Sequence, residues 1–315
     1  DKYFQSDMAK KILLYNIVFL GGTPANTPAL YSIMAHIDFE MGVWFPKGGI
    51  GSVVEALEKL CKQHNVELHY NEPVIGVNIQ NDSIKQIHTQ KSSYESDLVV
   101  NTSDYPFFET QILPKEHRSY DANYWEKSTI APSGFIAYLG FNKKIQSLSH
   151  HNLFLDNDWM KHFDSIFNNP SWPESPSYYV SCPSKTDPSV APEGCENVFI
   201  LVPVAPGLSD TDEIREHYFD KTISHLENLT GENLKEHIIV KKLAGHREFK
   251  SLYNSYKGTA LGLSHTLMQT AIFRPHNKSK KVKNLYYSGQ YTNPGIGVPM
   301  ALISAEITSN LINND

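Results

Sequence analysis

Residues 287–299 have the sequence YSGQYTNPGIGVP and join a short apolar segment to a helix-like one. Leu285 to Ser288 favour a short strand, and the residues from Pro299 to about Ile312 favour a helix. Pro299 suits the first turn of that helix, where its missing N–H costs little. The segment therefore predicts a strand, a glycine-rich turn and a helix in direct succession.

Such a succession is suited to binding an anion or a dipole. The free N–H groups at a helix start point the same way, the helix dipole adds positive charge, and glycine lets a ligand approach the backbone. The segment has neither the Lys-Ser/Thr pair of a Walker loop nor a GxGxxG pattern. From the residues alone, a ligand site and an ordinary structural turn both remain open.

Upstream of this turn, the sequence predicts a mixture of helices and short strands. Apolar residues at helical spacing predict helices over residues 28–41 and, after the glycine turn 47–51, over a segment with Val53, Val54, Leu57, Leu60 and Cys61 on one side. Alternation with period two predicts strands at residues 66–70, 74–80, 84–90 and 96–101, with a hairpin at Asn81-Asp82. The last of these strands ends on polar residues 101–104, where α/β sheets place ligands.

The middle of the chain predicts a second, antiparallel-rich domain. Strands are predicted at residues 134–141, 178–182 and 198–204, and a helix from about 210 to 229 with Ser209 as its cap. The apolar run 12–20 is too short to span a bilayer, which needs about 20 residues. The order of elements suggests one domain that is interrupted by the insertion of another.

Composition and charge exclude several classes of protein. The 315 residues carry 28 Lys and Arg against 34 Asp and Glu, a net charge of −6, which provides no electrostatic footprint for nucleic acid. The three cysteines, Cys61, Cys182 and Cys195, cannot all pair, so a reducing, cytoplasmic setting is expected. Aromatic residues make up 11%, which fits either the walls of an apolar pocket or an ordinary core.

Three further motifs, in order along the chain, carry a family resemblance. They are GVWFPKGG at residues 42–49, YVSCPSKTDP at 179–188 followed by APEG at 191–194, and FRPHN at 273–277. Together with YSGQYTNPGIGVP, they resemble bacterial carotenoid desaturases of the phytoene desaturase type, which are FAD-dependent members of the amine-oxidase-like flavoprotein superfamily. The resemblance covers essentially the whole chain and matches the C-terminal two-thirds of the family.

The resemblance implies an α/β fold. It consists of an FAD-binding Rossmann-like domain, whose N-terminal βαβ unit with its GxGxxG turn is missing here, and an inserted α+β substrate domain with an antiparallel sheet. The implied domains are a substrate- or membrane-facing lobe at 1–46, parts of the FAD domain at 47–105 and 273–315, and the substrate domain at 106–272. Asp1 is then not expected to be the natural N-terminus.

The resemblance also implies the cofactor and the residues that hold it. FAD is expected to contact Val74, Asn101, Gly289, Gln290, Tyr291, Gly295, Ile296, Gly297, Val298 and Met300. Many relatives in the wider superfamily have an acidic residue where this chain has Gln290. Candidates for a substrate channel are Tyr31, Trp44 and Phe45, each of which equally fits a core position. No catalytic base is identified.

The activity implied is the introduction of C=C bonds into a C30 or C40 polyene by hydride transfer to flavin, without a metal. The protein is then expected to be cytoplasmic and peripheral on a membrane. A flavin-dependent carotenoid isomerase or a retinoid saturase-like enzyme is the enzymatic alternative. A non-catalytic fragment that binds apolar ligands or membranes is the alternative from another class, and we expect the chain alone to be inactive and to retain FAD poorly.

Other residues that suggest chemistry have simpler interpretations. His150 and His151 are adjacent in a strand-like segment, so their side chains are expected on opposite faces, and no metal site is predicted. Cys182 and Cys195 lack CxxC spacing and are expected to be buried thiols. No GxSxG pattern supports a hydrolase.

Overall fold

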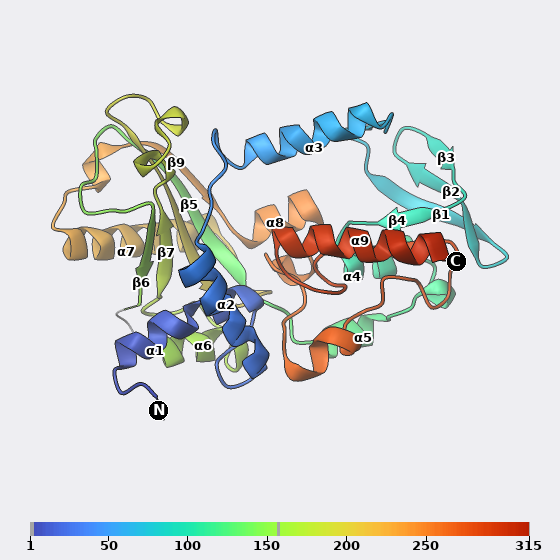
Figure 1. The fold of residues 1–315 in the computed structure, drawn as a ribbon, viewed down its shortest axis with the longest axis horizontal. Helices are drawn as coiled ribbons and strands as arrows, with labels where there is room; N and C mark the ends of the chain where they lie inside the picture. Colours follow the sequence, from blue (N-terminus) through green and yellow to red (C-terminus); the bar gives the residue numbers. More distant parts are fainter. Residues whose placement is uncertain (1–2, 156–157, 315) are drawn as a thin grey trace. The chain divides into compact units, whose positions relative to one another are not determined.

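The computed structural model describes residues 3–155 and 158–314, and the chain divides into two compact units (Figure 1). Unit 1 comprises residues 1–13, 33–68 and 133–248, and unit 2 comprises residues 14–32, 69–132 and 249–315. Each unit is thus assembled from three separate stretches of the chain. The functional domain boundaries at residues 46, 105 and 272 remain predictions.

Unit 1 contains a five-stranded antiparallel sheet. Its strands, in the order β6-β7-β8-β5-β9, are β6 (His151–Phe154), β7 (Tyr178–Ser181), β8 (Glu196–Val204), β5 (Ser133–Phe141) and β9 (Ile238–Ala244). Strands β5 and β8 pair over their full length, from Ser133 opposite Val204 to Phe141 opposite Glu196. The predicted strands near 134, 178 and 198 are confirmed. The sequence analysis did not predict β9, whose apolar and lysine residues are mostly exposed and do not alternate in burial.

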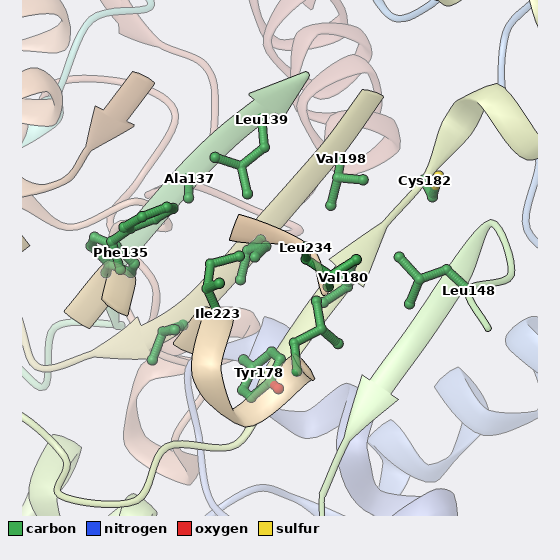
Figure 2. Packing of buried hydrophobic residues seen from close by; sticks show 14 of the residues in the cluster. Phe135, Ala137, Leu139, Leu148, Tyr178, Val180, Cys182, Val198, Ile223 and Leu234 are labelled. Atoms are coloured by element: carbon green, nitrogen blue, oxygen red, sulfur yellow. The ribbon is translucent and has the colours of Figure 1, made fainter. Parts of the chain in front are cut away.

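The long helix α7 (Asp212–Thr230) packs against this sheet and completes the core of unit 1. Ile223 and Leu226 of α7 are fully buried in this core. Figure 2 shows Ile223 with Phe135, Val180 and Val198 of the sheet. The helix is capped by Thr211, whose hydroxyl accepts the N–H of Ile214 at 3.3 Å. The prediction of Ser209 as the cap is therefore wrong, since the helix begins at Asp212, two residues later than predicted.

Several other helices of unit 1 bury no residue: α1 (Asp7–Leu14), α2 (Ile33–His36), η3 (Ile37–Met41) and α3 (Gly51–Gln63). Helix α6 (Trp159–Phe167) buries Trp159, Phe163 and Ile166, whereas α8 (His246–Tyr253), which continues into unit 2, buries only His246. The predicted helix 28–41 is divided into a 3₁₀ turn, η2 (Ala29–Ser32), an α turn and a π turn. The predicted helix after Gly51 is confirmed, although Val53, Val54, Leu57 and Leu60 are exposed.

Unit 2 contains two small sheets. Strands β1 (Val74–Gln80), β2 (Ser83–Thr89) and β3 (Ser93–Glu95) form an antiparallel sheet, and β4 (Val99–Asn101) pairs in parallel with β10 (Leu285–Tyr287). Asn81 and Asp82 have φ values of 52° and 58°, as a tight hairpin turn requires, so the predicted hairpin is confirmed. The predicted strand 66–70 is wrong: these residues form no strand, and Asn71 then has a φ of 54°.

The core of unit 2 is rich in aromatic rings. Tyr105 stacks on Tyr287 with ring centroids 3.8 Å apart, and Trp125 is fully buried beside them. The helices of this unit include η1 (Tyr15–Leu20), α4 (Tyr105–Phe107), η4 (Phe108–Ile112), α5 (Ala122–Lys127) and α9 (Val298–Asn314). Within the described part of the chain, no helix is both long and apolar enough to cross a membrane.

Candidate functional site

A cavity of about 660 Å³ opens in unit 2 beyond the ends of strands β4 and β10. Because these strands are parallel, their carboxyl ends lie at the same edge, and the residues that follow them gather there. The start of helix α9 forms another side of the cavity. The residues that line the cavity come from three stretches of unit 2: 101–105, 249–261 and 287–305.

The structure brings most of the predicted cofactor residues to this cavity. Those that line it are Asn101, Gly289, Gln290, Tyr291, Ile296, Gly297 and Val298. Gly295 and Met300 belong to the same segment without lining the cavity. Val74 begins strand β1 of the other sheet and is 38% exposed. Contact of these residues with FAD stays a prediction.

The glycine turn, residues 288–297, has a backbone that only glycine adopts easily. Gly289, Gly295 and Gly297 have φ values of 124°, 129° and 126°. A Cβ atom at Gly289 would meet no atom within 4 Å, so open space lies over this part of the turn. At Gly295, in contrast, a Cβ atom would lie 2.2 Å from the ring of His265.

His265 supports the turn with both ring nitrogens. Its Nε2 accepts the N–H of Ile296 at 3.2 Å, which leaves the proton on Nδ1 to be donated to the hydroxyl of Tyr31 at 2.6 Å. The hydroxyl of Tyr31 also hydrogen-bonds to the hydroxyl of Thr270 at 2.6 Å, a pair in which either group can donate. Burial, with a contribution from Arg274, lowers the pKa of His265 to about 3, so the ring is neutral at neutral pH. Tyr31, predicted in a substrate channel, thus belongs to this network.

Asp104 is the buried carboxylate of the cavity wall. It caps helix α4 by accepting the N–H of Phe107, and it also accepts the N–H of Tyr256 and the hydroxyl of Tyr291 at 2.8 Å. Burial raises the pKa of this carboxyl to about 6, although these hydrogen bonds favour its ionised form. Asp104 therefore joins the end of β4 to the glycine turn and to the loop before residue 257.

A second buried carboxylate, Glu109, lies behind the cavity wall. It accepts the hydroxyl of Tyr287 and the N–H of Tyr120, and burial raises its pKa. Tyr287 lines the cavity, so Glu109 fixes the orientation of a wall residue.

Helix α9 is attached to the glycine turn through small polar side chains. The hydroxyl of Ser304 accepts the N–H of Gly289 at 3.1 Å and contacts the hydroxyl of Thr292 at 2.7 Å, and Thr308 donates to the carbonyl of Tyr287 at 3.0 Å. Ile303 and Leu311 of the same helix are exposed, so these apolar side chains do not form its buried face. The spacing of apolar residues in this helix did not indicate that Ser304 and Thr308 form its buried face.

Unit 1 contains the other two candidate channel residues and the histidine pair. Trp44 is 89% exposed, and Phe45 lies edge-on to His150 with ring centroids 5.1 Å apart. The rings of His150 and His151 stack at 4.2 Å. The prediction that they lie on opposite faces is wrong, because β6 begins only at His151 and His150 lies outside the strand.

The motif at residues 179–188 forms contacts within unit 1. Asp187 accepts the N–H of Gly48 at 2.7 Å, which ties the motif to the glycine turn 47–51. Cys182 is fully buried as predicted, and burial raises its pKa to about 11, whereas Cys195 is only half-buried, contrary to the prediction. In residues 3–155 and 158–314, no three His, Cys, Asp or Glu side chains cluster as a metal site would require.

Solved structures define the class of fold. An oxidoreductase from Methanosarcina mazei superposes with a TM-score of 0.69 at 15% identity, over 98% of this chain and 66% of that one. A putrescine oxidase double mutant superposes with a TM-score of 0.58 at 11% identity, over 100% of this chain and 66% of that one. These similarities show a mixed α/β fold of the flavin amine oxidase type, with an antiparallel sheet.

The chain belongs to the family described as flavin containing amine oxidoreductase, whose model matches residues 2–313. It is 44% identical, over its whole length, to a carotenoid 3,4-desaturase of Haloarcula japonica and covers 64% of that protein. It is 30% identical over 98% of its length to a zeta-carotene-forming phytoene desaturase of Myxococcus xanthus and covers 60% of it. The resemblance predicted from the motifs is thus confirmed, and the chain spans less than two thirds of these relatives.

Proposed function

We propose that the protein is an FAD-dependent carotenoid desaturase, which removes a hydride and a proton from adjacent carbons of a C30 or C40 polyene. The observation that carries this proposal is the unit 2 cavity. It is lined by the glycine turn and the start of α9, in a chain whose relatives are named carotenoid and phytoene desaturases.

The residues of the cavity fit a flavin in three respects. The backbone is open over Gly289, where a Cβ atom would meet nothing, and the start of a long helix supplies N–H groups for an electron-rich edge. The aromatic ring of Tyr287 and the side chains of Val298 and Leu302 supply apolar contacts for a planar ring. Bound FAD would supply the acceptor for the electron pair, while the protein residues orient it and exclude water.

The residues that contact the polyene are a separate part of the proposal. Tyr31, Trp44 and Phe45 are our candidates for contact with the polyene, since they are aromatic residues from the segments that the family uses for its substrate lobe. We also propose that the protein touches a membrane surface peripherally, since its substrate dissolves in lipid. The exposure of Met41, Val43 and Trp44 supports this contact.

The test is a single-turnover reaction with stoichiometric oxidised FAD and a polyene in liposomes, without oxygen. Desaturation bleaches the flavin absorption band and moves the polyene absorption to longer wavelength, because each new double bond extends the conjugation. An isomer without flavin bleaching supports the isomerase alternative. A parallel reaction that starts from stoichiometric reduced FAD tests the saturase-like alternative, in which the reduced flavin is reoxidised and the conjugated system is shortened. Polyene binding with no chemical change supports the non-catalytic alternative.

A further inference from the structure

Arg274 is a buried arginine directly behind the glycine turn. Its side chain is 2% exposed and donates to four backbone carbonyls. Two belong to the turn, those of Gln290 at 2.6 Å and Thr292 at 3.1 Å, and two belong to Leu263 at 3.2 Å and Gln269 at 2.9 Å. The guanidinium thus holds the turn in place through its backbone.

No carboxylate among the described residues forms an ion pair with this guanidinium. Asp104, which lines the same cavity, accepts hydrogen bonds from Phe107, Tyr256 and Tyr291 instead. Burial lowers the pKa of Arg274 to about 10, so the side chain stays charged at neutral pH. A buried charge without a counter-ion costs several kcal/mol, which a neutral side chain in a purely structural role would avoid.

The hydrogen bonds to Arg274 fix the orientation of two peptide groups of the turn. In a trans peptide the C=O and N–H groups point in opposite directions. The carbonyl of Gln290 faces Arg274, so the N–H of Tyr291 points away from it. The same holds for Thr292 and the N–H of Asn293. These two N–H groups carry the positive ends of peptide dipoles, which are favourable to an anion, and Tyr291 lines the cavity.

We propose that Arg274 is the fixed counter-charge for an anionic group bound in the unit 2 cavity. If the cavity holds FAD, as in the proposed function, that group is either the pyrophosphate or the isoalloxazine ring once it is reduced. Both groups place negative charge next to the glycine turn. The pyrophosphate is charged whenever FAD is bound, whereas the ring is charged only once it is reduced.

The experiment compares Arg274→Met with Arg118→Met as a matched control. Arg118 also donates to backbone carbonyls, of Leu113 and Thr110, but does not line the cavity and does not contact the glycine turn. The probes are inorganic pyrophosphate, riboflavin and FAD, titrated calorimetrically. We expect Arg274→Met to weaken pyrophosphate binding at least tenfold and Arg118→Met to leave it unchanged.

The flavin probes distinguish the two sources. If the anion is the cofactor pyrophosphate, Arg274→Met weakens FAD at least tenfold and leaves riboflavin unchanged. If it is the reduced ring, oxidised FAD binds equally well to both proteins. The two-electron reduction potential of the bound FAD then falls by about 30 mV for each tenfold loss of affinity for the reduced form. Equal results for the two variants with every probe would overturn the proposal.

Two further outcomes keep the inference separate from the proposed function. If neither flavin binds to this chain while pyrophosphate binding still depends on Arg274, the anion site stands independently of the flavin function. If Arg274→Met does not fold, the Nε–H resonance of Arg274 in the unaltered protein serves as the readout. A shift of that resonance on addition of pyrophosphate supports the site, and an unchanged resonance at saturating pyrophosphate and FAD contradicts it.

Discussion

Gly295 is the residue of the glycine turn with the least room for a side chain. Its φ of 129° and the 2.2 Å that would separate an added Cβ atom from the His265 ring both oppose any substitution. Gly295→Ala should therefore lower the free energy of unfolding by more than about 2 kcal/mol, from backbone strain and overpacking together. Urea unfolding measures this loss.

The control for this substitution is Gly76→Ala in strand β1 of the same unit. Gly76 has no atom within 4 Å of its Cβ position and no positive φ. Alanine there should be neutral or stabilise by up to about 1 kcal/mol, because it restricts the unfolded chain. Equal losses at the two positions would mean that the contact with His265 is not what requires glycine.

Asp104 should give the protein a measurable pH dependence. Burial raises its folded-state pKa from 3.8 to about 6, so the folded protein binds this proton more tightly than the unfolded chain does. The resulting stabilisation is fully present below about pH 4 and is lost as the pH rises through 6, by up to about 3 kcal/mol. Asp104→Asn removes this component. The difference in unfolding free energy between the two proteins should change over that range, whereas parallel curves would refute the assignment.

At the scale of elements, the attachment of α9 to the glycine turn depends on Ser304. Ser304→Ala leaves the N–H of Gly289 and the hydroxyl of Thr292 without this partner, which should cost about 1–3 kcal/mol. Ser309→Ala, on the exposed face of the same helix, should change stability by less than about 0.5 kcal/mol. Thermal unfolding of both variants measures the contrast, and a similar small effect of both would show that the helix is held by other contacts.

Local pattern was sufficient for some elements and insufficient for others. The alternation in 74–80 and 84–90 and the tight turn between them predicted β1 and β2, because a hairpin is specified by adjacent residues. Residues 66–70 alternate similarly but form no strand, since alternation does not provide a pairing partner. The missed strand β9 obtains its place from pairing with β5, a contact that its own sequence does not encode.

The candidate site likewise has a part that local sequence predicted and a part that it did not. The glycine turn was predictable because its residues are consecutive and glycine spacing is a local signal. His265 and Arg274 were not predicted as site residues, because they reach the turn from separate segments and only the folded chain brings them together. Asp104 belongs to the polar strand end that was predicted near a ligand, but its contact with Tyr291 was not predicted. A motif containing Arg274 was noticed, but its role depends on the carbonyls that it contacts.

At the scale of the whole molecule, the two units have separate cores. Leu226 is fully buried in the core of unit 1 and Leu285 in the core of unit 2. Leu226→Ala and Leu285→Ala should each cost about 2–5 kcal/mol, from lost burial and the cavity left behind. Because the cores share no residue, each variant should raise amide hydrogen exchange mainly in its own unit, and the two losses should add in the double variant. An equal rise in both units after a single substitution would show instead that the chain unfolds as one cooperative body.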